Sequence, residues 1–389
     1  MKIEKQLPNR HLRNKKSALQ LLTGVTFVLL LPQAYSAEFT TKATITAGVE
    51  YDSNPAMTNG QKNPVLIYSL NPDLLLDVKE ESNQWYLDAS LMDQRYSNEK
   101  VLVNRDDPKL VAGFNHTYES GLIGIKASYW EASSVLDQLT TTGILSQVNN
   151  TERNQLLAVN WQQTINSRWS ALTNAAYHST RYSIASPFSL SGYEFDEIGS
   201  KLTYANNDQL DTYAQLGYAF LNPDLNFEST NKVNLMVGTD YKINENLKLN
   251  ASAGIYNLSG RQTDTSWEGD VSAIYTGEHI HYSAGLNRGI APTGLGGFQK
   301  SNALKLGLAY NRTEYDRFEA DYAVTRYIKD ASIIGLDKVD YQQVSAFYER
   351  DLSIHWKARI SATYRILEST ARSNGSLIGA TLSYDTLSF

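Results

Sequence analysis

The sequence predicts an all-β protein, namely a single transmembrane antiparallel barrel of about eighteen strands with short turns at one end and longer loops at the other. Three observations favour this fold class. Apolar and polar residues alternate with a period of two, short and long connections alternate along the chain, and aromatic residues mark one end of successive segments. The 389 residues include no cysteine, so backbone pairing rather than disulfides must hold the fold.

The alternation is clear in individual segments. Val233, Leu235 and Val237 alternate with Lys232 and Asn234, which gives a strand one apolar face and one polar face. Almost no stretch places apolar residues at helical spacing. The same pattern predicts strands over 41–51, 65–79, 83–97, 107–118, 121–132, 151–164, 167–180, 193–206, 208–221, 229–243, 246–259, 264–276, 279–290, 300–311, 316–328, 338–350, 354–367 and 375–389.

The connections between these strands differ in length. Short ones such as 119–120 and 244–245 alternate with long ones such as 52–64 and 133–150. Short periplasmic turns and longer outer loops are typical of outer-membrane barrels. A soluble sandwich is the alternative, but this many amphipathic strands exceed what one sandwich holds, whereas a closed barrel has no edges and lets lipid cover the apolar face.

Residues 1–36 form the first expected unit. Basic residues precede an apolar run over 18–31, and Ala34, Ser36 and Ala37 follow it, an order typical of a secretory signal peptide that is cleaved after Ser36. A membrane anchor is the alternative, although the run is short for a spanning helix. The barrel is then expected over 37–389, with no periplasmic module before its first strand, in the outer membrane of a Gram-negative bacterium.

Aromatic residues suited to a membrane interface end the outward rows of the descending strands. They form an expected periplasmic girdle: Tyr118, Trp161, Tyr204, Tyr241, Tyr275, Tyr310, Tyr348 and Tyr384. Such rings sit best where hydrocarbon meets water. At the opposite rim, Arg95, Arg288 and Arg326 end outward rows, either as lipopolysaccharide contacts or as ordinary solvated charges.

The inward rows are expected to line a water-filled lumen. The candidate lining residues are Lys201, Lys232, Lys248, Lys357, Arg359, Arg365, Glu319, Asp321, Glu349, Tyr86, Tyr213 and Tyr256. Over all the inward rows, ten basic side chains are expected beside eleven acidic ones, and this mixed charge disfavours a channel dedicated to a densely anionic polymer. The charges either select polar solutes or pair to stiffen the wall, and the tyrosines either stack on sugars or pack the lumen. Loops 133–150 and 181–192 carry apolar residues that could fold inward as a constriction.

No enzyme, cofactor or metal is expected. His279 and His281 share one face of a strand, but a third metal ligand is missing. No nucleophile and base pair is evident. The expected partners are outer-membrane lipids, lipopolysaccharide and a polysaccharide or oligosaccharide in the lumen, with no nucleic acid.

The chain ends on a strand-like segment, I-G-A-T-L-S-Y-D-T-L-S-F, in which Leu387 and Phe389 lie on the opposite parity from Tyr384. This ending resembles the carboxy-terminal signal that the barrel-assembly machinery recognises in bacterial outer-membrane proteins. The opposite parity indicates either a bulge or a slip in the expected register.

The segment G-V-E-Y-D-S-N-P, residues 48–55, resembles the opening strand of β-barrel porins encoded with exopolysaccharide biosynthesis systems. The resemblance implies export of a secreted exopolysaccharide across the outer membrane, with separate periplasmic and inner-membrane components delivering the polymer. A diffusion channel for small polar solutes or oligosaccharides is the alternative.

Overall fold

The computed structural model describes residues 37–60, 62–134, 150–183, 190–224, 227–328, 338–369 and 371–386. The chain divides into Met1–Glu38 and a second unit, Phe39–Phe389. The expected signal peptide therefore lies outside the described residues. Within the described part, no helix is long and apolar enough to cross a membrane.

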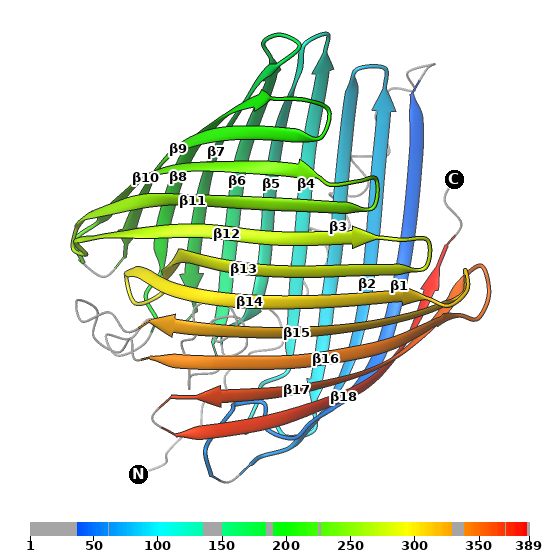
Figure 1. The fold of residues 1–389 in the computed structure, drawn as a ribbon. Coiled ribbons are helices and arrows are strands. Elements are labelled where there is room, and N and C mark those ends of the chain that lie inside the picture. Colours follow the sequence, from blue (N-terminus) through cyan, green and yellow to red (C-terminus); the bar gives the residue numbers. More distant parts are fainter. Residues whose placement is uncertain are drawn as a thin grey trace, which may run out of the picture. The chain divides into compact units, whose positions relative to one another are not determined.

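Eighteen strands follow one another in the described residues (Figure 1). They are β1 Glu38–Asp52, β2 Val65–Glu80, β3 Asn83–Tyr96, β4 Arg105–Tyr118, β5 Gly121–Ser133, β6 Thr151–Thr164, β7 Trp169–Tyr182, β8 Tyr193–Ala205, β9 Leu210–Pro223, β10 Thr230–Lys242, β11 Leu247–Gly260, β12 Asp264–Thr276, β13 Ile280–Thr293, β14 Gly297–Asn311, β15 Asp316–Ile328, β16 Val339–Asp351, β17 Trp356–Glu368 and β18 Arg372–Asp385. The expected strands match these in number and order.

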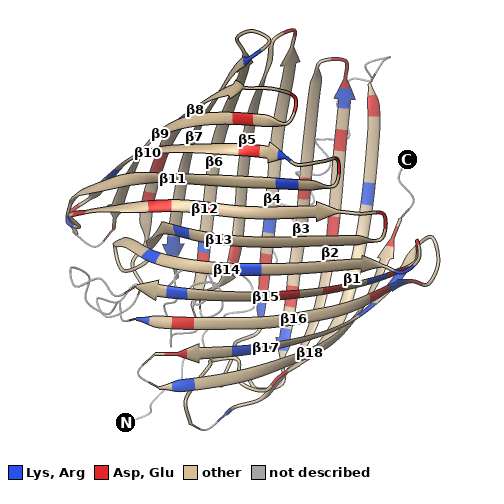
Figure 2. Cartoon of the chain, viewed as in Figure 1, with Lys and Arg blue, Asp and Glu red and all other residues tan. Residues whose placement is uncertain are grey.

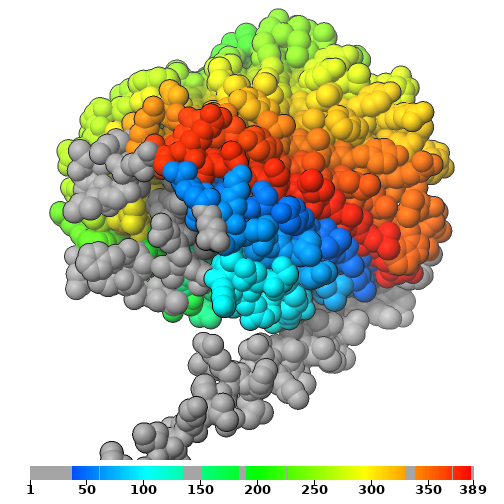
Figure 3. All heavy atoms as spheres, turned by 90° about the horizontal axis from the view of Figure 1, so that it is seen from below, coloured from blue at the N-terminus to red at the C-terminus, as the bar shows by residue number. Residues whose placement is uncertain are grey.

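Each strand pairs with its neighbours in sequence, and β1 pairs antiparallel with β18. The register of that closing pair runs from Thr44 opposite Asp385 to Asp52 opposite Leu377. Figure 3 shows the blue first strands beside the red last ones. The sheet is therefore a closed antiparallel barrel, and the predicted fold class is confirmed.

The two ends of the barrel differ in their connections. At the end that carries the turn 81–82, here called the short-turn end, every connection is brief. At the opposite, long-loop end the connections range from 134–150 down to 294–296. The sequence-based strand limits, which left residues 291–299 as a loop, were wrong. Pro292 pairs with Phe298, so the two strands extend further, and Gly296 completes the tight turn between them with a φ of 77°.

Apolar side chains cover the outside of the barrel. Val237, Ile255 and Ile360 are 59%, 61% and 63% exposed, and each belongs to an outward row of its strand. Since exposed apolar side chains on this scale need a nonaqueous environment, the outer face suits lipid. Apolar residues thus occupy the face that a soluble barrel would give to polar ones.

The buried residues lie mostly on the inner face toward the long-loop end. One cluster joins Tyr193, Phe195, Ala219, Leu221, Tyr256, Leu258 and Phe298 from β8, β9, β11 and β14. A second contains Met57, Tyr327, Tyr341 and Leu367, and a third contains Val65, Ile67, Tyr96 and Leu102. Because Met57 and Leu102 come from loops, those loops fold against the inner wall.

Candidate functional site

Basic and acidic side chains are spread over strands all around the barrel (Figure 2). On the inner face many of them pair across strands. Lys232 Nζ lies 2.8 Å from Glu268 Oε2, and Arg359 Nε lies 2.8 Å from Glu349 Oε2. Such pairs reduce the net field in the lumen and hold neighbouring strands together.

The residues predicted to line the lumen all belong to inward rows of their strands. They are Lys201, Lys232, Lys248, Lys357, Arg359, Arg365, Glu319, Asp321, Glu349, Tyr86, Tyr213 and Tyr256. The structure brings Arg359 together with Glu349. It also places Lys201 Nζ 3.6 Å from the centre of the Tyr213 ring.

Other lumen candidates pair with residues outside this set. Lys357 pairs with Asp385 at 3.5 Å, and Glu319 forms an ion pair with Arg317. These two lumen candidates therefore contact different partners rather than each other. Lys248 lies opposite Lys242 in the register of β10 and β11.

The inward tyrosines pack the wall instead of offering free ring faces. A Cβ added at Gly113 would lie 2.2 Å from the Tyr86 ring, so that ring lies directly on the glycine of the next strand. Tyr213 covers Gly238 in the same way. Tyr256 is 2% exposed. These contacts favour the packing alternative, and stacking of these tyrosines on sugars stays a prediction.

Arg365 does not line open space either, because it is buried in an ion pair with Asp52. Arg365 Nη2 donates to Asp52 Oδ1 at 2.7 Å and to Oδ2 at 2.6 Å. Two residues after Asp52, Asn54 holds the loop that follows β1. Its Nδ2 donates to the carbonyls of Thr58 at 3.0 Å and Asn374 at 2.9 Å. The Asp-Ser-Asn part of the opening segment therefore anchors loop 53–64 to β17 and β18.

Residues 53–60 of the loop after β1 pack against the inner wall at the long-loop end. Met57 has a φ of 48° and is 1% exposed against Tyr327, Tyr341 and Leu367. Of the loops that were expected to fold inward, 133–150 and 181–192, most residues lie outside the described part. In the described part of the second, Ser191 N donates to Gly294 O at 2.7 Å.

A polar recess of about 460 Å³ opens on the inner face across β7 to β14. Its polar lining consists of Asn174, Glu197, Gln215, Lys232, Asn234 and Glu268, and its apolar lining includes Phe195, Ile290, Pro292 and Phe298. Gly199 and Gly217 stand opposite each other in the register of β8 and β9 and also line it. It is the candidate binding site of the described inner face.

The predicted aromatic girdle residues lie on outward rows at the short-turn end. They are Tyr118, Trp161, Tyr204, Tyr241, Tyr275, Tyr310, Tyr348 and Tyr384. Several meet an aromatic partner: Trp161 Nε1 donates to Tyr118 Oη at 2.8 Å, and Tyr384 lies 5.0 Å from Trp356 between ring centroids. The structure thus places them on the outer surface near the short turns, and their role as a girdle at the membrane interface stays a prediction.

Each of the three rim arginines contacts a side chain of a neighbouring strand. Arg95 lies 2.8 Å from Asp106, Arg326 lies 2.8 Å from Asp340, and the Arg288 guanidinium lies 4.4 Å from the centre of the Trp267 ring. All three are therefore held in place along the outer surface rather than projecting freely.

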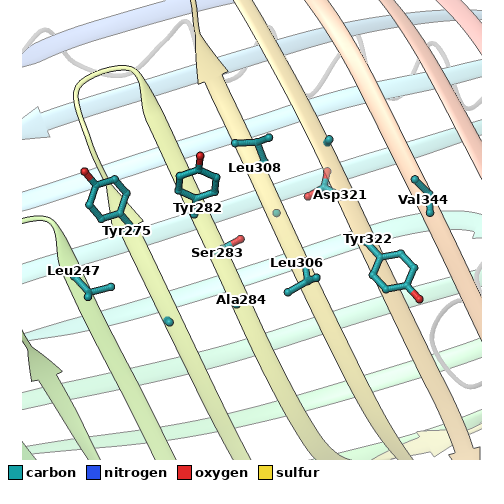
Figure 4. Close-up of a pocket in the computed structure, with 13 residues that line it drawn as sticks. Leu247, Tyr275, Tyr282, Ser283, Ala284, Leu306, Leu308, Asp321, Tyr322 and Val344 are labelled. Carbon is teal, nitrogen blue, oxygen red and sulfur yellow. The ribbon is translucent and has the colours of Figure 1, made fainter.

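Figure 4 shows a depression of about 490 Å³ on the outer face, among Leu306, Leu308 and Tyr322. Small side chains at Ala273, Ala284 and Ala320 leave this space between larger neighbours. Most of its lining, including Tyr275, Leu306 and Tyr322, belongs to outward rows, although Ser283, Gly307 and Asp321 come from inward rows. The depression therefore opens toward lipid and is no candidate for a polar solute.

The two strand-spaced histidines do not assemble a metal site. His281 Nδ1 lies 3.1 Å from Thr276 Oγ1, and His279 Nε2 lies 3.9 Å from Glu278. Among the described residues, no group of three or more histidine, aspartate or glutamate side chains is arranged to hold a metal ion.

Closure, an apolar outside and a polar inside together define a transmembrane β-barrel of the outer-membrane type. Barrels of this class lie in the outer membrane of Gram-negative bacteria. The sequence matches no protein-family model and no curated protein.

Solved structures share the fold at low sequence identity. OpdQ of Pseudomonas aeruginosa aligns with a TM-score of 0.51 and 10% identity over 90% of this chain and 98% of that chain. OccAB4 of Acinetobacter baumannii aligns with a TM-score of 0.49 and 13% identity over the same shares. The FrpB iron transporter of Neisseria meningitidis aligns with a TM-score of 0.50 and 8% identity over 85% of this chain and 62% of that chain. These similarities concern the fold.

Two results concern residues at the limits of the sequence analysis. Leu387 and Phe389, the expected assembly signal, lie outside the described residues. Glu197 and Asp52 were missed, although parity gave a signal for both: Glu197 shares the inward row of Lys201, and Asp52 that of Glu50.

Proposed function

We propose that the chain forms a water-filled channel for small polar solutes across the outer membrane. The observation that carries the proposal is the exposure of charged side chains on the inner face of a closed barrel. The side chains of Glu197, Lys109 and Asp240 are 50%, 51% and 44% exposed. Charges facing inward at this exposure need water in the lumen, and barrels of this strand number are wide enough to hold it.

The inner face favours small solutes over a polymer. Loop residues such as Met57 and Leu102 pack against the inner wall at the long-loop end, which reduces the space there. Many inner charges are already paired, as between Lys232 and Glu268, so the lumen has no strong field of one sign. The FrpB structure, named an iron transporter, adds support for transport in general.

Export of an exopolysaccharide has less support. It rests on the resemblance of segment 48–55. Three of those residues have positions in the barrel that do not depend on which solute passes through it. Tyr51 is exposed on the outer face, Asp52 binds Arg365 and Asn54 holds loop 53–64. Only export would require separate periplasmic and inner-membrane partners.

Conductance in planar lipid bilayers tests the proposal. The purified barrel should give stepwise currents in potassium chloride, and small sugars should enter barrel-containing liposomes and swell them. Long dextrans should neither enter nor block. Absence of current steps in correctly folded protein would overturn the channel, whereas block by long neutral polymers together with loss of surface polysaccharide on gene deletion would favour export.

The proposal includes membrane partners. We propose that the barrel-assembly machinery inserts the chain through a terminal signal containing Leu387 and Phe389. Lipopolysaccharide contact at Arg95, Arg288 and Arg326 is proposed alongside it. Replacing these three arginines by glutamine and finding unchanged antibiotic permeability would remove the lipopolysaccharide contact.

A further inference from the structure

The polar recess on the inner face has the features of a ligand site rather than of a gap in packing. Gly199 on β8 stands opposite Gly217 on β9. A Cβ at Gly199 would meet no neighbouring atom nearer than 3.6 Å, so the space above this glycine is open. Glycine inside a strand leaves room for close approach of a ligand to the backbone.

The charges around the recess exclude one class of ligand. Lys232, its one lysine or arginine, is paired with Glu268 at 2.8 Å, and Asn234 Nδ2 donates to the same carboxylate at 2.5 Å. Glu268 therefore neutralises the ammonium charge of Lys232, which an anionic solute would need as its partner. A carboxylate- or phosphate-bearing solute has no free cation in this part of the wall.

The remaining polar groups match hydroxyls. Glu197 is half exposed, and its ion-pair contact is His178 at 3.6 Å, which is long for a hydrogen bond. A carboxylate accepts hydrogen bonds from two hydroxyls, while the amides of Asn174 and Gln215 both donate and accept. Ile290 and Pro292 give the recess an apolar side against which carbon-bound hydrogens can pack.

We infer that this recess binds a neutral polyhydroxylated solute, with Glu197, Asn174 and Gln215 as its hydrogen-bonding groups. The inference rests on the proposed channel and names the class of solute that it takes. A recess of about 460 Å³ accommodates a ligand of roughly one or two sugar rings, within the ordinary range of small-molecule sites.

Current block by maltose in planar bilayers, with the full-length barrel, measures the binding. Glu197→Gln should weaken the apparent affinity for maltose about tenfold, because hydrogen bonds to a charged acceptor are the stronger ones. Gly199→Val should abolish the block, since the valine side chain would occupy the open space above this glycine.

Two matched controls lie outside the recess. Asp321→Asn removes a charge from the inner row of β15, and Gly285→Val adds a side chain where the nearest neighbouring atom is 3.9 Å from the Cβ. Both should leave the block by maltose unchanged.

The outcomes separate the two proposals. Absence of current in every variant would defeat the channel itself. Normal current with the same maltose block in all four variants, or with no block in the parent, would overturn the recess as a sugar site while the channel stands. Block by lysine or gluconate but not by maltose would assign the recess to charged solutes and overturn the inference.

Discussion

Arg365 and Asp52 form a buried ion pair between residues 313 positions apart in the sequence, with Nη2 of the arginine 2.7 Å and 2.6 Å from the two carboxylate oxygens. The pair joins the end of β1 to β17 on the far side of β18. Their side chains are 9% and 4% exposed. Loss of either partner leaves a buried charge without compensation.

Asp52→Asn should therefore destabilise the barrel by about 3–5 kcal/mol, the usual cost of removing one member of a buried pair. Urea unfolding in lipid vesicles measures the effect. Glu349→Gln, which breaks a pair whose arginine is 42% exposed, is the control and should cost much less. Equal losses in the two variants would show that burial of the Asp52 pair has no special weight.

Asn54→Ala should raise the single-channel conductance. Asn54 holds loop 53–64 by bonds to Thr58 and Asn374, and release of the loop frees Met57 from the inner wall. The control is Asn207→Ala, because Asn207 Oδ1 accepts from Leu210 N at 2.9 Å in a turn at the short-turn end. Unchanged currents in Asn54→Ala would mean that the loop does not limit ion flow.

Gly113→Ala should destabilise the barrel by about 1–3 kcal/mol, the usual cost of overpacking. The new methyl group would overlap the Tyr86 ring. In Gly285→Ala the methyl group meets no atom nearer than 3.9 Å, and stability should hardly change. Combining Gly113→Ala with Tyr86→Ser should recover part of the loss; strict additivity of the two changes would contradict the proposed contact.

Ile255→Arg should reduce the stability of the folded barrel in vesicles by about 2–4 kcal/mol, because Ile255 faces outward and an arginine there would meet lipid. Ser252→Arg is the matched inner-face change. Ser252 lies opposite Asp270, so its arginine would find an acidic neighbour. A larger loss for Ser252→Arg would invert the assignment of the two faces.

The alternation of residue types was enough to predict the strands and their faces, because successive side chains of a strand point to opposite faces of the sheet. Val233 and Lys232 fall on opposite faces for that reason. The positions of Trp161 and Tyr384 on the outward rows followed from the same parity. Burial could not be predicted in this way, since a period of two says nothing about what covers an inward side chain.

Tyr256 and Arg365 show the limit. Both face inward as predicted, but Phe298 and loop 53–64 come from distant parts of the chain and cover this end of the wall. The recess depends in the same way on strand register: Gly199 and Gly217 align only once β8 and β9 pair. Register and loop placement are long-range properties, and no local pattern determines them.

The pairing of β1 with β18 sets the order in which the protein can be built. The edge of β1 that pairs with β18 has no partner until the residues near 385 have been synthesised, so until then the two outer edges of the growing sheet display unpaired amide and carbonyl groups. Joining segments so distant also carries a large entropic barrier. Closure of the barrel can therefore follow only after β18 has been made, and chains that have not yet closed need shielding from one another on the way to the bilayer.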